Sequence, residues 1–171
     1  MPDAGAVRVR LITLDDYDAV ARLTVEAYRA DGQLEASPDY AAALADVAGR
    51  AEAADVLVAE IDGVALGAVT FTVAGGEYAE VSRPGEAEFR MLAVDPAAQR
   101  RGVARALVRA CLDRASGLGC GGVAICVRDD NPGAFALYEG FGFVRDASRD
   151  WSPVPGVNLL GLWIGLPALA K

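Results

Sequence analysis

The sequence predicts one domain of the α/β (α+β) class, with helices packed on a mixed central sheet of about seven strands in the order βααβββαβαββ. Two observations carry this prediction. First, β-rich runs alternate with amphipathic helical segments along the whole chain. Second, the run Gly122–Val127 is apolar without a break, which is typical of a strand buried on both faces of a sheet. A predicted helix just before this run bridges it to the preceding strand as a crossover connection.

The N-terminal half is expected to form a strand, two helices and a β-hairpin. In chain order, these elements are predicted at residues 7–12, 15–30, 37–53, 56–61 and 64–73. Valine and leucine alternate with arginine in the first strand, and Asp31-Gly32 ends the first helix. Ser37-Pro38 provides an N-cap and a first-turn proline for the second helix. Asp62-Gly63, between the last two runs, is the strongest hairpin signal in the chain.

The C-terminal half is expected to alternate strands and helices and to end in two strands. The elements are predicted at residues 88–94, 103–117, 122–127, 131–138, 143–151 and 159–166, after a long connection. The helix at 103–117 has a wide apolar stripe and keeps arginines on its solvent side. Asn131-Pro132 caps the next helix, and Gly140 and Gly142 follow its end. The resulting order is that of helices layered on a sheet.

The composition is that of an ordinary globular protein and argues against several partners. Hydrophobic residues make up 53% of the 171 positions and charged residues 23%. The net charge of −8 and the pI near 4.5 argue against nucleic-acid binding, which needs a basic surface. No apolar stretch is long and unbroken enough to span a bilayer, and the first ten residues do not resemble a signal peptide. We therefore expect a cytoplasmic protein without a membrane or nucleic-acid partner.

Residue types that the chain lacks exclude several kinds of site. It contains no histidine, so a Ser-His or Cys-His nucleophile cannot form, and no metal site is expected because only carboxylates and isolated thiols remain as ligands. Cys111, Cys120 and Cys126 have no CxxC spacing, which favours structural thiols. Residues 117–122 match the pattern GxGxxG, but they follow a helix and precede a strand, the reverse of a dinucleotide site.

An unusual charge pattern marks the start of the helix at 103–117. Unpaired N–H groups at a helix start carry roughly half a positive charge and favour acidic neighbours, yet Arg100, Arg101 and Arg105 surround this one. A multiply charged anion removes the conflict, because backbone amides and guanidinium groups bind it together. Gly102 lets the backbone approach such a ligand closely. These residues are interpreted as a pyrophosphate site, and a merely solvated turn is the alternative.

The strand before this loop carries a carboxylate at its other end. Side chains alternate between two faces, one with Glu88, Arg90, Leu92 and Val94 and the other with Phe89, Met91 and Ala93. With a rise of roughly 3.3 Å per residue, Glu88 is expected about 20 Å upstream of the anion end, a span that suits a long cofactor arm. Glu88 is therefore a candidate proton acceptor, and a solvated carboxylate at a strand end is the alternative.

Two motifs resemble those of the GCN5-related N-acetyltransferase (GNAT) superfamily. Gln99-Arg100-Arg101-Gly102-Val103-Ala104 fits its signature Q/R-x-x-G-x-G/A, with Ala104 where glycine is common. The segment Asp129–Phe143 is similar to its second cofactor segment. The order of elements from Val7 to Leu166 also agrees, so the resemblance covers nearly the whole chain. It implies a single acyl-CoA N-acyltransferase-like domain over residues 1–171, with acetyl-CoA as co-substrate and no metal.

The resemblance also implies a role for each candidate site residue. The backbone of Leu92, Ala93 and Val94 would pair with the pantetheine arm. The residues that would hold the diphosphate are Gln99, Arg100, Arg101, Gly102, Val103, Ala104 and Arg105. Asn131 would contact the pantetheine arm, Tyr138 would protonate the departing thiolate, and Glu88 would be the general base. Without the resemblance, a helix N-cap and a core aromatic would explain Asn131 and Tyr138.

The implied reaction is transfer of an acetyl group from acetyl-CoA to a primary amine of a small molecule or peptide, by direct attack in a ternary complex. An alkyl amine with a pKa near 10.4 must first lose a proton, which costs about 4.6 kcal/mol at pH 7. The alternative is a non-catalytic acyl-CoA-binding or sensing domain on the same fold. Acceptor contacts are expected from residues 29–40, 77–86 and 151–158. Their acidic side chains point to a cationic amine, and solubility explains the same surface acidity equally well. These side chains are Asp31, Glu35, Asp39, Glu77 and Glu80. Dimers are common in the superfamily, and a homodimer is compatible with the sequence.

Overall fold

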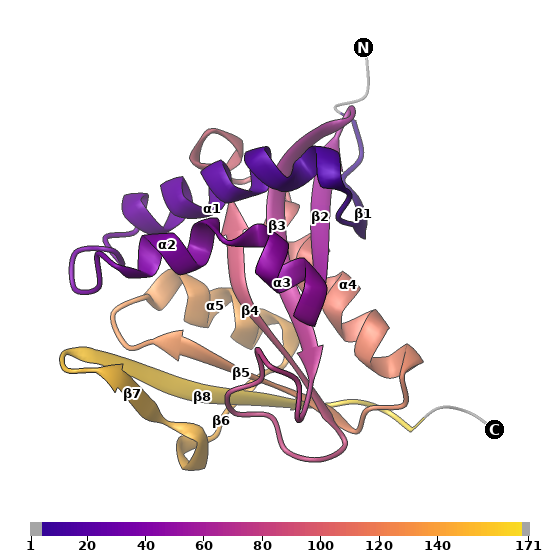
Figure 1. The fold of residues 1–171 in the computed structure, drawn as a ribbon. Helices are drawn as coiled ribbons and strands as arrows, with labels where there is room; N and C mark the ends of the chain where they lie inside the picture. Colours follow the sequence, from indigo (N-terminus) through magenta and orange to yellow (C-terminus); the bar gives the residue numbers. More distant parts are fainter. Residues whose placement is uncertain (1–4, 169–171) are drawn as a thin grey trace. The chain divides into compact units, whose positions relative to one another are not determined.

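The computed structural model describes residues 5–168, whose path is drawn in Figure 1. The chain divides into two compact units, each made of two segments. The first unit comprises the chain up to Phe71 and Met91–Cys111, and the second comprises Thr72–Arg90 and the chain from Leu112 onward. The single domain expected from the sequence stays a prediction.

The predicted fold class is confirmed. Eight strands form one mixed sheet, and the described residues contain five α-helices. There is one strand more than the sequence predicted because the run at 143–151 is divided into two strands. There is one helix more because the predicted helix at 37–53 is also divided.

The first unit is built on four neighbouring strands in the order β1-β2-β3-β4. Its elements are β1 (Arg8–Leu11), α1 (Tyr17–Ala30), α2 (Tyr40–Ala45), α3 (Val47–Ala53), β2 (Asp55–Ile61), most of β3 (Val64–Val73), the end of β4 (Glu86–Val94) and the start of α4 (Val103–Gly117). The β1–β2 and β2–β3 pairs are antiparallel. The predicted hairpin between β2 and β3 is confirmed: Asp62 and Gly63 both have positive φ, 51° and 79°, as a type I′ turn requires.

Helices cover both faces of this part of the sheet (Figure 1). One buried cluster joins α1, α3, β2 and β3 through Val20, Val47, Val58 and Ala68. Gly67, next to Ala68 in β3, points to the opposite face, because successive strand residues alternate. A Cβ at Gly67 would lie 2.6 Å from Val103 Cγ1 and 3.1 Å from Leu107 Cδ1, both in α4. The absence of a side chain at Gly67 therefore lets α4 pack closely on β3.

The helix predicted at residues 37–53 is wrong in its extent. Asp46 ends α2 with a ψ of 69°, outside the helical region, and its side chain then caps the start of α3. The buried side chain of Arg50 in α3 stabilises the break between the two helices. Its Nη1 donates to the carbonyl oxygens of Ala43 and Leu44, each at 2.8 Å. Carbonyls in the last turn of α2 thereby gain hydrogen bonds from a side chain of α3.

The second unit holds the remaining strands, in the order β4-β5-β8-β6 with β7 paired to β8. Its further elements are the end of α4, β5 (Gly122–Arg128), α5 (Pro132–Phe141), β6 (Val144–Arg145), β7 (Trp151–Val154) and β8 (Val157–Gly165). β4 and β5 run parallel, with Glu88 opposite Ala124, so the predicted crossover is confirmed. β8 pairs antiparallel with β5 along the whole length of β5.

The strand predicted at residues 143–151 is interrupted by a 3₁₀ turn at Ala147–Arg149. Gly161 of β8 shows why the backbone leaves the sheet here. A Cβ at Gly161 would lie 2.6 Å from both Arg149 Cβ and the Asp146 carbonyl oxygen. The carboxylate of Asp146 caps the turn by accepting from the Ser148 N–H at 3.1 Å and from Arg149 Nε at 2.8 Å. Local capping therefore replaces strand pairing over these residues.

The substitution Asp16→Asn is expected to destabilise the first unit in a pH-dependent way. Arg10 donates to both oxygens of Asp16, at 2.7 and 2.9 Å, and lowers the pKa of this carboxyl to about 2 despite its burial. A lowered folded-state pKa contributes stability above the unfolded value near 4, which is lost as the pH falls toward 2. Because Arg10 is one-third exposed, we expect a loss of about 1 kcal/mol at pH 7. Urea unfolding at pH 7 and at pH 2.5 measures it. The exposed neighbour Asp15→Asn is the control, and an equal loss at both pH values would contradict the prediction.

Candidate active site

The proposed anion loop lies in the first unit between β4 and α4. β4 ends at Val94, and the Asp95 carboxylate caps a short 3₁₀ turn by accepting from the Ala97 N–H at 3.0 Å. The following residues are exposed, and both Arg100 and Gly102 have positive φ, 64° and 79°. The loop therefore turns sharply just before the helix begins.

The start of α4 is open to a ligand. The first turn holds no acidic residue, and a Cβ built on Gly102 would meet no atom within 4 Å. Ala106 donates to the Gly102 carbonyl at 3.0 Å, so the N–H groups before Ala106 precede the first helical hydrogen bond. An exposed helix start with arginines and no carboxylate fits a diphosphate, which accepts from amides and guanidinium groups alike.

The end of β4 leads into this loop from the core of the first unit. Ala93 is buried against Leu23 and Ala27 of α1, while Leu92 and Val94 are partly exposed on the other face. Met91 has a φ of 55°, in the left-handed region that non-glycine residues rarely adopt. Nothing in the sequence indicated this departure from regular strand geometry. It turns the backbone just before the residues predicted to pair with the pantetheine arm.

Glu88 lies in the second unit and is 2% exposed. Its carboxylate is not at a solvated strand end, because backbone N–H groups of three successive residues donate to it. The donors are Glu80, Val81 and Ser82, at 2.8 to 3.0 Å. Glu88 therefore anchors the connection between β3 and β4, and its role as a base stays a prediction.

Asn131 and Tyr138 lie on α5 in the second unit. Asn131 is the N-cap of this helix, and its Oδ1 accepts from the Ala134 N–H at 3.1 Å. Tyr138 is 7% exposed. Its ring centroid lies 5.9 Å from that of Phe89 and 5.7 Å from that of Phe143. These contacts fix the ring, and they link Tyr138 to the residue that follows Glu88 in β4. Cofactor contact and thiolate protonation stay predictions.

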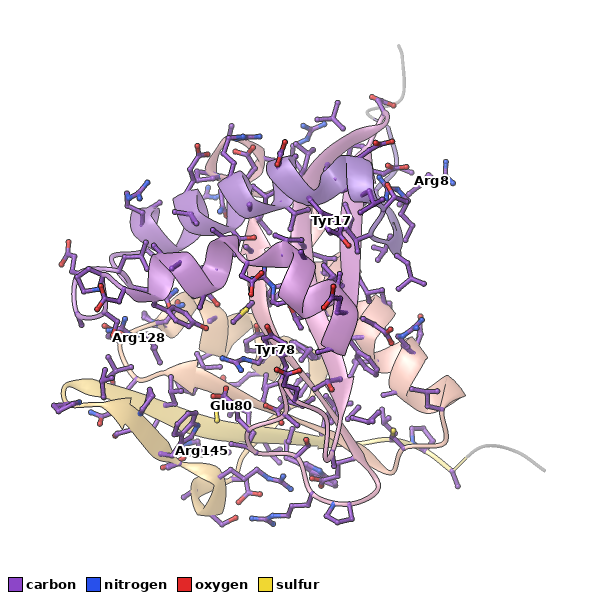
Figure 2. All side chains as sticks on the ribbon, in the orientation of Figure 1. Arg8, Tyr17, Tyr78, Glu80, Arg128 and Arg145 are labelled. Carbon is purple, nitrogen blue, oxygen red and sulfur yellow. The ribbon has the colours of Figure 1, made fainter. Side chains whose placement is uncertain are left out.

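The sequence named Glu80 as an acidic residue of the acceptor rim but gave no sign of its surroundings. The side chain is 24% exposed, and its Oε1 lies 3.3 Å from Arg90 Nε. Burial raises the pKa of Glu80, the neighbouring charge of Glu88 raises it further, and Arg90 opposes both effects. Figure 2 shows Glu80 and Tyr78 on the connection between β3 and β4. The Arg90 guanidinium lies over the Tyr78 ring, 5.9 Å from its centroid.

Cys126 of β5 remains a thiol at neutral pH. Burial, together with the charges of Glu88 and Glu80, raises the pKa of Cys126 to about 12. Only a thiolate is an effective nucleophile, so this cysteine is not activated for attack on a thioester. Cys111 is fully buried. The environments of both thiols agree with the structural role predicted from their spacing.

The fold places the protein among the mixed α/β proteins. In this one, strand β4 leads into an arginine-containing loop at the start of helix α4. The chain matches the model of the Acetyltransferase (GNAT) family over residues 17–143, well over half of its length. The protein therefore belongs to this family, and the resemblance inferred from the two motifs is confirmed.

Individual relatives agree with the family assignment. The chain is 47% identical over 77 residues to the N-alpha-acetyltransferase RimI of Mycobacterium tuberculosis, a match that covers 42% of this chain and 47% of RimI. The matched region thus spans about half the length of that relative.

Two solved structures share the fold over 97% of both chains. The ribosomal-protein-S18-alanine N-acetyltransferase of Escherichia coli has a TM-score of 0.71 at 20% identity. The protein yncA of Salmonella typhimurium, solved with its cofactor acetyl-CoA, has a TM-score of 0.65 at 19% identity.

Over residues 5–168, no helix is both long and apolar enough to cross a membrane. The same residues contain no group of three or more histidine, cysteine, aspartate or glutamate side chains that could hold a metal ion.

Proposed function

We propose that the protein transfers an acetyl group from acetyl-CoA to a primary amine, by direct attack within a ternary complex. The observation that carries this proposal is the family match, which includes the exposed, arginine-flanked start of α4. In this proposal residues 99–105 bind the diphosphate. The backbone at residues 92–94 pairs with the pantetheine arm, and Asn131 contacts the same arm.

The proposed chemistry needs two proton transfers. The amine must lose a proton before it attacks the thioester carbon, and the thiolate of CoA must gain one as it leaves. We assign the second step to the hydroxyl of Tyr138, which packing holds in a fixed place. We assign deprotonation of the amine to a carboxylate near the first half of β4. The sequence had indicated Glu88 for this role. The raised pKa of Cys126 supports direct attack, because an acyl-enzyme would need a thiolate.

For the acceptor we propose an N-terminal α-amine of a peptide or protein. Two relatives carry names that describe such substrates, an N-alpha-acetyltransferase and a ribosomal-protein-S18-alanine N-acetyltransferase. Physical chemistry favours the same class, because an α-amine with a pKa near 7.8 costs only about 1 kcal/mol to deprotonate at pH 7. The first unit also has an open pocket of about 310 Å³ that overlaps the predicted acceptor region at residues 29–40. It is lined by Arg29, Leu34, Glu35, Pro38 and Ala41.

The experiment that tests the proposed function is an acceptor panel. Purified protein is given acetyl-CoA and, in separate reactions, peptides with free N-terminal alanine, spermidine and an aminoglycoside, and release of CoA thiol is followed. We expect release with the alanyl peptides. Tight CoA binding without release for any amine would favour the alternative, a non-catalytic acyl-CoA-binding domain. Binding itself should raise the unfolding free energy by about 2.7 kcal/mol at one hundred times the Kd.

Arg101→Ala is expected to weaken CoA binding about tenfold, because one charge-assisted contact to phosphate is worth roughly 1.5 kcal/mol. The loss should shrink as salt is raised, since exposed charges are screened. Titration with CoA and with S-acetyl-pantetheine measures it. The second ligand lacks the diphosphate and serves as the control. If both ligands lost affinity equally, Arg101 would not act on the diphosphate.

A further inference from the structure

Backbone N–H groups of three successive residues donate to the carboxylate of Glu88. Oε1 accepts from the N–H groups of Glu80, Val81 and Ser82 at 3.0, 2.9 and 2.8 Å, and Oε2 accepts from Glu80 at 3.0 Å. All of these donors belong to the backbone and cannot rotate away. A proton on Glu88 would remove the negative charge that these N–H groups stabilise, and hydrogen bonds to a neutral carboxyl are weaker than those to a carboxylate. Glu88 is therefore better suited to hold the chain than to shuttle protons.

Glu80 lies next to Glu88, but its carboxylate is more exposed and accepts no backbone hydrogen bond that the structure records within residues 5–168. Its backbone N–H is fixed by both oxygens of Glu88, while its carboxylate is partly open to solvent. Among the described residues, Arg90 is its ion-pair partner, with Arg90 Nε 3.3 Å from Oε1. Arg90 is itself held by the Tyr78 ring and by a 3.4 Å bond to the Tyr78 carbonyl oxygen. Arg90 thus orients the Glu80 carboxylate and leaves it able to accept a further hydrogen bond.

The surroundings of Glu80 favour its action as a base, because burial and a neighbouring carboxylate raise its pKa. The groups that act on it are Arg90 and Glu88 of β4, and Cys126 of β5 is electrostatically linked to it but remains a neutral thiol. Burial and the negative charge of Glu88 raise the pKa of Glu80 from its ordinary value, against the effect of Arg90. A carboxylate whose pKa moves toward the working pH accepts a proton more effectively.

We propose that Glu80 accepts the proton of the acceptor amine and that Glu88 is a positioning residue that holds Glu80 in place. This inference rests on the proposed acetyltransferase function. An ammonium group loses two protons on becoming an amide. One passes to a Glu80 oxygen and then to solvent, which frees the nitrogen lone pair to form the C–N bond. The C–S bond then breaks, its electron pair goes to sulfur, and the second proton balances the thiolate, which leaves as CoA thiol.

The test compares three matched variants of the full chain, Glu80→Gln, Glu88→Gln and Glu139→Gln, with the amine that the wild-type protein acetylates. Glu139 is an exposed carboxylate on α5 and controls for the loss of one negative charge. For each variant, kcat and KM are measured from pH 6 to pH 8.5 by thiol release, together with Tm and CoA affinity. If the wild-type protein acetylates no amine of the panel, the proposed function fails, and this inference fails with it.

For Glu80→Gln, we expect an unchanged Tm and CoA affinity and a kcat lowered about 10²-fold at pH 6. The ratio of wild-type kcat to Glu80→Gln kcat should fall by roughly tenfold for each pH unit as the pH rises toward the pKa of an α-amine. At higher pH, more of the amine is already deprotonated in solution. Glu88→Gln should lower Tm. It should also lower kcat by a factor that is the same at every pH, because this substitution displaces Glu80 but leaves its carboxylate in the protein. Glu139→Gln should behave as wild type.

Two results would overturn the assignment. If Glu88→Gln showed the deficit that narrows with pH and Glu80→Gln did not, Glu88 would be the base. If Glu80→Gln raised KM for the amine and left kcat unchanged, Glu80 would bind the ammonium group without accepting its proton.

Discussion

Replacing Arg149 with alanine is expected to lower the free energy of unfolding by about 3 kcal/mol. Arg149 is 6% exposed and joins three segments of the second unit. Nη1 and Nη2 bond to the two oxygens of Glu86 at 2.7 and 2.9 Å, Nη1 also donates to the Val81 carbonyl at 2.7 Å, and Nε donates to Asp146. Removing one partner of a buried ion pair leaves its counter-charge desolvated, which typically costs about 3 to 5 kcal/mol.

Arg145→Ala is the matched control for Arg149→Ala. Arg145 also forms a bidentate pair, with Asp150 at 2.6 and 2.7 Å, but both side chains are about one-third exposed or more. Exposed pairs contribute roughly 0 to 1 kcal/mol, so the two arginines should differ severalfold in urea unfolding. Equal losses would show that burial of the Arg149 cluster has no energetic consequence.

The stabilisation by Arg149 should weaken in acid. Burial alone would raise the pKa of Glu86, but hydrogen bonds from Arg149, the Arg83 N–H and Trp163 outweigh it and lower the pKa. A lowered carboxylate pKa contributes stability above its unfolded value, and that contribution is lost as the pH falls below it. The difference between wild type and Arg149→Ala should therefore shrink below about pH 4.

The sequence predicted those parts of the molecule whose cause is local. Asp62-Gly63 specifies a turn by its own backbone preference, and the apolar run of β5 reports burial on both faces. The anion site before α4 was inferred from arginines at a helix start that favours acidic neighbours, which is also a local signal. Each of these predictions needed only residues adjacent in the chain.

Features that depend on distant partners were not predictable from the sequence. The division of the helix at 37–53 requires Arg50 to reach back to the end of α2, and the turn after β6 requires the close approach of Gly161. The sequence placed Glu88 at a strand end but did not indicate its hydrogen-bond donors. These donors lie six to eight residues earlier, in a connection with no regular structure. A pattern of residue types does not reveal which backbone amides will fold onto a carboxylate. These contacts are the reason that we propose Glu80 as the base and Glu88 as the residue that positions it.

Tyr138→Phe is expected to lower kcat about 10²-fold while leaving the fold and CoA binding nearly unchanged. The ring packs between Phe89 and Phe143, and phenylalanine keeps both contacts. What the substitution removes is the hydroxyl proposed to protonate the thiolate, and positioned proton transfer typically contributes roughly 10² to 10⁴ in rate. Steady-state thiol release gives kcat, and the shift in Tm on adding CoA reports binding.

The control for this substitution is Tyr17→Phe, which removes a hydroxyl from a tyrosine at the edge of the first unit's core. It should retain wild-type kcat. Replacing the thiol leaving group changes the demand for an acid, because a thioester whose thiol has a lower pKa needs less protonation as it departs. With the acetyl thioester of an aryl thiol, such as S-phenyl thioacetate, the difference in kcat between wild type and Tyr138→Phe should therefore narrow. A full deficit with both thioesters, or none with acetyl-CoA, would remove Tyr138 from thiolate protonation and leave the ring as a packing element of α5.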